Sequence, residues 1–211
     1  MRVNVIGTPL ILHELTRIRD RRTGGIAFRK GLTHIGRYFG YEITKSFGYR
    51  EKDITTPFGP AKGIEIEDME NVLIVNVLRA SIPLVDGLLK VFPDARVGIV
   101  SAFRGPAPDF EISIDYIRVP EIKREDVVIV ADPMVATGST MLHVLKELEK
   151  FGTPEREIIA CVLTTQYAID RLEKEHPSAE LYTAAIDPEI DSHGYIIPGL
   201  GDAGDRAFSK A

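Results

Sequence analysis

The positions of apolar residues over the first part of the chain predict two helices. Apolar side chains recur at helical spacing over residues 9–19, and Pro9 occupies a plausible first-turn position. A second stretch with helical spacing runs from residue 28 to about residue 43, where Gly31, Gly36 and Gly40 interrupt it. Residues 55–60 read Thr-Thr-Pro-Phe-Gly-Pro, which is typical of a turn or loop.

From residue 71 onward, short apolar runs alternate with amphipathic segments. The runs predict strands at residues 71–78, 96–101, 127–131, 158–163 and 181–186, and residues 111–119 alternate well enough for a strand or ribbon. The segments between them predict helices at residues 82–92, 140–151 and 167–175. Nearly continuous apolar strands separated by helices predict an α/β fold with a mainly parallel central sheet and helices on both faces.

Length and composition indicate an ordinary globular protein. The 211 residues suit one domain, 1–211, in which residues 1–48 form an N-terminal helical extension. No apolar run is long enough to span a bilayer, and the N-terminus lacks the pattern of a signal peptide. The single cysteine, Cys161, lies in an apolar run, so we expect a buried, reduced thiol in a cytoplasmic protein.

The distribution of charge separates the N-terminal region from the rest. The formal net charge of −5 argues against general binding of nucleic acid. Residues 1–50, however, carry ten Lys or Arg against three Asp or Glu. We favour a solvated helical face or a subunit interface as the interpretation, and a site for an anionic effector is the alternative.

Residues 127–140 carry the clearest chemical pattern. A strand of four to five apolar residues ends on Asp132, and a short turn leads into a helix that opens with small and hydroxyl residues, Thr137, Ser139 and Thr140. A parallel sheet binds ligands at the carboxyl ends of its strands, and a helix N-terminus attracts phosphate. Gly138 lets the backbone approach a ligand closely. The alternative is an ordinary cluster of helix N-cap residues.

Two arginines follow other predicted strands. Arg79 comes directly after the strand at 71–78, and Arg104 follows the strand at 96–101. Both positions lie at the same sheet edge as Asp132, where two guanidinium groups are able to hold a pyrophosphate by bidentate bonds. An isolated Arg is more often part of a surface ion pair, which is the competing interpretation.

The C-terminal region is a second, independent signal. Residues 194–208 read Gly-Tyr-Ile-Ile-Pro-Gly-Leu-Gly-Asp-Ala-Gly-Asp-Arg-Ala-Phe, a glycine-rich and irregular segment. Its composition suggests a tight loop against an apolar slot, whose backbone N–H and C=O groups suit a planar ligand with paired donors and acceptors. The alternative is a frayed C-terminal tail.

These two segments resemble motifs of a known family. Residues 127–140 resemble the motif that binds 5-phospho-α-D-ribose 1-diphosphate (PRPP) in type I phosphoribosyltransferases. Pro133 replaces the second acid of that motif, as is typical of the uracil branch, where the pattern is Asp-Pro-Met-x-Ala-Thr-Gly. Residues 194–208 are similar to the uracil-binding element of that branch over almost their whole length.

The resemblance implies a pentosyltransferase that converts uracil and PRPP into UMP and diphosphate in pyrimidine salvage. It implies a C-terminal base-binding hood at residues 187–211 and catalytic roles for Asp132, Arg104 and Asp202. PRPP contacts are implied for Arg79, Arg104, Asp132, Pro133, Met134, Val135, Ala136, Thr137, Gly138, Ser139, Thr140 and Asp202. Uracil contacts, largely through backbone atoms, are implied for Ile196, Gly201, Asp202 and Ala203. Residues 105–110 would belong to a flap that closes over PRPP.

The resemblance also implies a cofactor and partners. Mg²⁺ is the expected cofactor, carried mainly by the diphosphate, with Asp202 as the candidate protein ligand. Relatives form dimers or tetramers and some respond to GTP, which implies a homodimer or homotetramer and an effector site at Lys30, Gly31, Leu32, Thr33 and His34. Two alternatives stay open: a phosphoribosyltransferase for another nucleobase, and a regulatory protein that senses PRPP or UMP.

Overall fold

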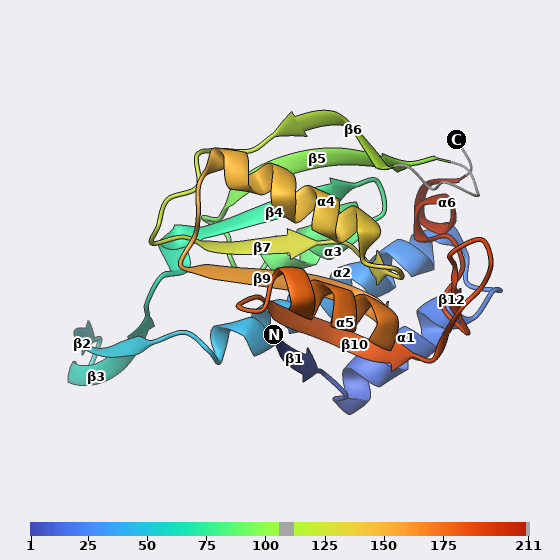
Figure 1. Cartoon of the computed structure of the whole chain (residues 1–211). Coiled ribbons are helices and arrows are strands. Elements are labelled where there is room, and N and C mark those ends of the chain that lie inside the picture. The colour runs from blue at the N-terminus through green and yellow to red at the C-terminus, as the bar shows by residue number, and fades with distance from the viewer. Residues whose placement is uncertain (106–111, 210–211) are drawn as a thin grey trace.

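A mainly parallel sheet forms the centre of the computed structural model, which describes residues 1–105 and 112–209 and describes Arg104 by its backbone only (Figure 1). All neighbouring strands on the main path of this sheet are parallel except β6, which runs antiparallel to β5 at one edge. In spatial order the path is β1 (Arg2–Val5), β10 (Glu180–Asp187), β9 (Arg156–Thr165), β7 (Val127–Ala131), β4 (Val72–Leu78), β5 (Arg96–Arg104) and β6 (Ile112–Arg118).

Helices cover both faces of the sheet, as the sequence predicts (Figure 1). On one face lie α1 (Pro9–Arg19), α2 (Gly25–Thr44) and α3 (Ile82–Leu89), and on the other lie α4 (Ser139–Leu148) and α5 (Gln166–Glu175). Single-turn 3₁₀ helices occupy Met69–Asn71 and Glu149–Phe151. Among the helices in the described ranges, none is long and apolar enough to cross a membrane.

The continuous apolar runs of the central strands follow from this double cover. In β4, Ile74 packs into the layer under α1, α2 and α3, and its neighbour Val75 packs into the layer under α4 and α5. Both side chains are fully buried. Residues that alternate in direction along a strand therefore all lose contact with water, and the expected hydrophobic–polar alternation disappears.

Helix α2 is continuous through the glycines that were expected to interrupt it. A Cβ atom at Gly36 would lie 2.1 Å from the carbonyl oxygen of Leu84 in α3, and one at Gly40 would lie 2.7 Å from the Val91 side chain. At Gly31 the same atom would lie 2.4 Å from the Ile18 side chain in α1. The glycines are thus contact points where α1, α3 and the residues after α3 approach the backbone of α2 closely.

Several elements were not predicted from the sequence. Strand β1 adds to the sheet edge by pairing with β10, and a short helix, α6 (Ala203–Phe208), lies in the C-terminal region. The loop expected at residues 55–60 is wrong at both ends, because β2 (Tyr49–Thr56) and β3 (Gly59–Ile66) form an antiparallel hairpin that pairs through Thr56 and Gly59. This hairpin projects away from the rest of the chain (Figure 1).

The close contact between α2 and α3 leads to a stability prediction. Gly36→Ala should lower the free energy of unfolding by about 1–3 kcal/mol, because the added methyl group forces the two helix backbones apart. Chemical denaturation measures this change. Gly7→Ala is the matched control, since a Cβ atom there meets nothing within 4 Å. Equal stability of the two variants would contradict the close contact.

Candidate active site

The point where the chain changes direction across the sheet lies between β4 and β7. These parallel strands are neighbours, with Asn76 paired to Ala131 near their carboxyl ends. After β4 the chain enters α3 on one face, whereas after β7 it enters α4 on the opposite face. In open α/β sheets, such a divergence leaves a crevice at the carboxyl ends of the strands, and ligands bind there. Arg79 and Asp132 follow these two strands directly.

The loop after β7 is held by hydrogen bonds that its carbonyl oxygens accept from neighbouring elements. Within it, β8 (Met134–Val135) pairs with β9. Donors from β9 and α5 bind four of these carbonyl oxygens. The Pro133 oxygen accepts from the Val162 and Leu163 N–H groups, both at 3.0 Å. The other three oxygens accept from side chains: Val135 from Thr164 Oγ1 (3.0 Å), Ala136 from Thr165 Oγ1 (2.7 Å) and Thr137 from Arg171 Nη1 (2.7 Å). With these oxygens engaged on one side, the loop is held in one conformation. Its N–H groups at Met134 and Ser139 are bonded within the loop, to Asp132 Oδ1 at 3.1 Å and to Thr137 Oγ1 at 3.3 Å.

The loop encloses a cavity at the N-terminus of α4. Residues 132 and 134–141 line this cavity, whose volume of about 60 Å³ holds a few water molecules. The α4 N-cap is Gly138, with a φ of 76° and no side chain to cap the helix. The Thr137 and Ser139 hydroxyls lie 3.1 Å apart, and Arg171 donates to Ser139 Oγ at 2.8 Å. The Thr137 hydroxyl accepts from the Ser139 N–H group at 3.3 Å, so part of the helix start is capped as the N-cap interpretation expects. The hydroxyl groups beside the helix N-terminus also suit a phosphate.

Asp132 stands at the mouth of this cavity with a strongly altered acidity. Its Oδ1 accepts a hydrogen bond of 3.1 Å from the Met134 N–H group. The carboxyl keeps some solvent exposure, but the surrounding protein removes enough water to raise its pKa to about 7. The Met134 bond opposes this effect and is too weak to cancel it. An acid with a perturbed pKa in a crevice is typical of a functional site.

Arg79 connects the end of β4 with the C-terminal region. Ser81 is fully buried and donates to Asn76 Oδ1 and to the Val77 carbonyl, which fixes the turn after β4. The guanidinium Nη2 of Arg79 lies 3.6 Å from Asp205 Oδ1 in α6. The structure thus brings together Arg79 and the glycine-rich segment, which the sequence separates by more than a hundred residues.

Arg104 is located by its backbone alone. Ser101 of β5 pairs with Leu78 at the end of β4, and β5 continues to Arg104 beyond that point. Its backbone therefore stands at the same edge of the sheet as Asp132. Residues 106–111, which hold most of the expected flap, lie outside the described residues.

The expected uracil-binding residues form a loop with buried anchors. Ile196 and Ala203 are buried in the core layer under α1 and α2, whereas Gly201 and Asp202 are exposed. The φ of 77° at Gly201 favours glycine. Asp202 caps α6, because its Oδ1 accepts from the Asp205 N–H group at 2.8 Å. The loop therefore presents the backbone of Gly201 and the carboxylate of Asp202 on the outside, and the uracil contacts stay a prediction.

A partly buried ion pair at the start of this loop is not evident from the sequence. Asp187 ends β10, is 4% exposed, and accepts two bonds from Arg19 of α1, at 2.7 and 2.6 Å. Arg19 also donates to the Gly199 carbonyl at 2.7 Å, and the Gly199 N–H group donates to Asp187 Oδ2 at 2.9 Å. Bidentate pairs of this kind are strong and directional, so they fix the turn before Gly201.

The expected metal ligand, Asp202, and the expected effector residues, 30–34, do not form compact sites. Within residues 1–105 and 112–209, no three His, Cys, Asp or Glu side chains converge as metal ligands, and Asp202 stands without such a cluster. Of the five candidate effector residues, Gly31 and Leu32 are buried between α1 and α2, and Lys30 and His34 are exposed. His34 Nδ1 lies 2.9 Å from Oε1 of the buried Glu14.

Known proteins match this chain over a range that includes both the crevice and the C-terminal loop. A family model described as uracil phosphoribosyltransferase matches residues 5–209. A uracil phosphoribosyltransferase from Thermococcus kodakarensis is 54% identical over 203 residues, covering 96% of this chain and 88% of the relative. One from Metallosphaera sedula is 46% identical, covering 99% of this chain and 100% of the relative. A solved structure of a protein from Aquifex aeolicus superposes with a TM-score of 0.90 at 31% identity, over 99% of both chains.

The raised pKa of Asp132 predicts that its carboxylate destabilises the free protein. The pKa rises from 3.8 in the unfolded chain to about 7 in the folded one, so stability falls as pH rises through this interval and stays low above it. Asp132→Asn cannot ionise. It should therefore be more stable than the parent at pH 8, by up to about 4 kcal/mol, and almost equal to it below pH 4.

Denaturant unfolding at pH 4 and pH 8 measures this difference. Asp191→Asn is the matched control of opposite sign, because backbone N–H groups from Tyr195 and His193 lower the pKa of Asp191. Its substitution should remove stability that is present at pH 8 and is lost as pH falls. An equal gain for Asp132→Asn at both pH values would contradict the buried-acid interpretation.

Proposed function

Because the chain belongs to the uracil phosphoribosyltransferase family and transfers the phosphoribosyl group of PRPP to uracil, we propose that the crevice beyond β4 and β7 is where the transfer takes place. The observation that carries this assignment is the phosphate-sized cradle of residues 134–141 beside Asp132, at the edge where the sheet connections diverge. The products are UMP and diphosphate.

Each part of PRPP has a counterpart in the crevice. The N–H groups and hydroxyls of residues 136–140 bind the 5′-phosphate at the start of α4. Asp132 accepts hydrogen bonds from the ribose hydroxyls. As the bond from C1 to the diphosphate breaks, positive charge develops on the ribose ring, and an ionised Asp132 stabilises that charge.

The leaving diphosphate takes up the negative charge. Arg79 and Arg104 stabilise it electrostatically from the ends of β4 and β5, and Mg²⁺ supplies further positive charge when bound. Mg²⁺ that arrives on the diphosphate and keeps its waters needs few protein ligands. Asp202, whose Oδ1 caps α6, would offer its other oxygen to this ion.

Uracil lies against the C-terminal loop. The contact between Arg79 and Asp205 brings α6 beside the position of the diphosphate, so Gly201 and its neighbours are close to the C1 atom that uracil attacks. Holding the base and C1 in reacting geometry is a large potential contribution to rate.

We also infer a place for the protein in the cytoplasm. Cys161 is buried and unpaired, and burial raises the pKa of its thiol to about 12, so it stays an unreactive thiol under reducing conditions.

The hairpin of β2 and β3 is the proposed contact between subunits of a homodimer or homotetramer. It projects from the rest of the chain (Figure 1). Five of its large apolar side chains are exposed, and Phe58 at the tip is fully exposed. The set is Tyr49, Ile54, Phe58, Ile64 and Ile66. Exposed apolar surface of this kind marks a surface that another protein covers, and a second copy of the chain offers the same hairpin in return.

GTP is the proposed effector, and we place it in a cavity of about 380 Å³ between α1 and α2, which His34 lines but the other four expected effector residues do not. Leu10, Glu14, His34, Arg37, Tyr38 and Tyr41 line this cavity. It combines a cation, aromatic rings and a buried carboxylate, which together suit a nucleotide. The same helix α2 begins beside α6, because Arg29 donates to the Ala207 carbonyl at 2.5 Å.

The substrate assignment is tested by supplying PRPP and Mg²⁺ with each nucleobase in turn. We expect nucleotide formation with uracil alone, and loss of the reaction when a chelator removes Mg²⁺. Arg79→Gln should raise KM for PRPP or lower kcat by about ten- to a hundredfold, through loss of a charged donor. Arg124→Gln, just before the opposite end of β7, is the control and should change neither. A purine product would point to another nucleobase, and no product with any base would favour a PRPP or UMP sensor.

Sedimentation tests the hairpin contact between subunits, and rate measurements test GTP as the effector. The parent protein should sediment as a dimer or tetramer, and Phe58→Asp should shift it toward the monomer, because a charge cannot be covered by an apolar partner. Lys62→Ser, on the same hairpin, is the control. Rates with and without GTP should differ for the parent. A parent that sediments as a monomer excludes the hairpin contact, and rates indifferent to GTP exclude the effector.

A further inference from the structure

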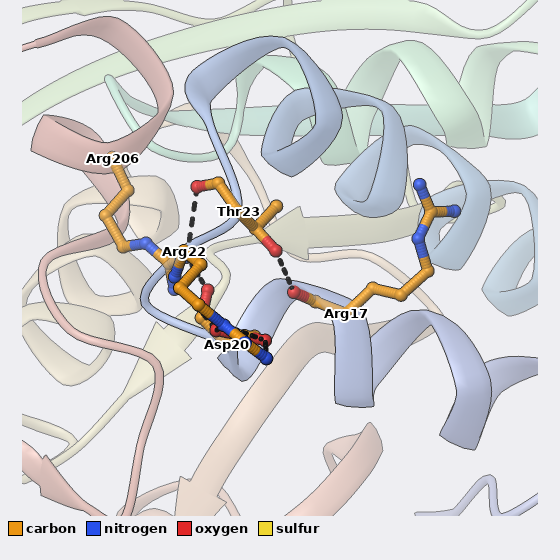
Figure 2. Close-up of polar contacts among 5 residues, drawn as sticks. All are labelled: Arg17, Asp20, Arg22, Thr23 and Arg206. Carbon is orange, nitrogen blue, oxygen red and sulfur yellow. Dashed lines mark hydrogen bonds and ion pairs between the residues drawn. The ribbon is translucent and has the colours of Figure 1, made fainter.

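Arg206 joins the C-terminal loop to the corner between α1 and α2, here called the α1–α2 corner (residues 18–24). The side chain extends from α6 toward this corner (Figure 2). Its Nη1 donates to the carbonyl oxygens of Ile18 and of Leu200, the latter at 2.7 Å. Its Nη2 donates to the carbonyl oxygens of Asp20 at 2.7 Å and Thr23 at 3.5 Å. One guanidinium thus binds three carbonyls of the corner and one in the loop.

The corner needs these donors because a helix ends there. The last carbonyl oxygens of α1 have no partners within the helix. The Thr16 oxygen accepts from the Asp20 N–H group, and the Arg17 oxygen accepts from Thr23 Oγ1 at 2.6 Å (Figure 2). Arg206 satisfies the next one, on Ile18, and brings a positive charge to the negative end of the helix.

The guanidinium is also held by packing. It lies over the Phe28 ring at 4.4 Å from the centroid, and partial burial lowers its pKa. The side-chain stem passes close to the loop itself, because a Cβ atom at Gly201 would lie 3.4 Å from Arg206 Cδ. Gly201 is the exposed residue next to Leu200 and one of the proposed uracil contacts. Arg206 therefore holds the peptide that joins Leu200 to Gly201 through the Leu200 carbonyl, and its stem lies beside Gly201.

We infer that Arg206 is a positioning residue for uracil, which sets the affinity for the base by locking the loop at residues 200–201 to the α1–α2 corner. This rests on the proposed role of the loop in binding uracil. The loop proposed to hold the 5′-phosphate is tied to β9 and α5 instead, so we expect KM for PRPP to change much less than KM for uracil. Movement of the α1–α2 corner changes uracil affinity through the same side chain.

Steady-state kinetics of Arg206→Gln and Arg206→Lys test this inference in the full-length protein with Mg²⁺. Arg206→Gln should raise KM for uracil about ten- to a hundredfold, because the charged donors are lost. KM for PRPP should stay within about twofold. Arg206→Lys should show a smaller rise, since one ammonium keeps the charge but cannot reach four carbonyls on two sides. Arg21→Gln is the matched control, because Arg21 is an exposed arginine at the same corner, and its substitution should leave KM for uracil unchanged.

A double-variant cycle tests the link to the corner. Thr23→Val removes the bond to the Arg17 carbonyl and leaves the C-terminal loop untouched. It should raise KM for uracil a few-fold in the parent and have no effect in the Arg206→Gln background. Additive effects of the two changes would overturn the link.

Other outcomes overturn the positioning role itself. Equal rises in both KM values, or a lower melting temperature with unchanged KM for uracil in Arg206→Lys, would make Arg206 a structural residue only. The Lys variant and its melting temperature decide the matter even where Arg206→Gln fails to fold. A parent that forms no UMP would remove the proposed function, whereas UMP formation with unchanged KM in the variants would remove this inference alone.

Discussion

The divergence of the chain after β4 and β7 is the constraint on which the rest of the structure depends. Two neighbouring parallel strands end together, and their connections leave for opposite faces, which opens a crevice beyond the strand ends. Arg79 and Asp132 are the residues that first enter this space. The cradle, the backbone of Arg104 and the C-terminal loop are then brought to the same edge by strand register and by long-range contacts.

The proposed phosphate cradle and the C-terminal loop must both pair their carbonyl oxygens, and both do so with side-chain donors. A loop that offers N–H groups to a ligand must place its carbonyl oxygens elsewhere, because unpaired polar groups are costly when buried. In the cradle, Thr164, Thr165 and Arg171 take up these oxygens. At the C-terminal loop, Arg19 and Arg206 do so, at Gly199 and Leu200. Arginine suits this role because its donors are fixed in a plane and reach several carbonyls at once.

The difference between what sequence and structure reveal follows from this arrangement. The buried strands and the segment around Asp132 are predictable because their signals are local: runs of apolar residues, a terminal acid, and a glycine beside hydroxyls. Arg171 and Arg206 escape prediction because each acts on carbonyls, which every residue has, so no partner stands out in the sequence. Strand β1 is too short and too exposed for its pattern to show. The glycines of α2 mark helix contacts that exist only after α1 and α3 have packed.

The burial of Asp132 lowers the stability of the free protein at the site proposed for catalysis. Its carboxyl lies where burial opposes ionisation, and a single backbone N–H group gives partial compensation. A ligand that brings positive charge and hydroxyl donors to this position supplies what the free protein lacks, and so favours the ionised acid. The same burial that weakens the free protein thereby strengthens the electrostatic interaction with a cationic ribose ring, because both effects grow as water is excluded. In the proposed site, the unfavourable burial of this acid would therefore be relieved when substrate binds.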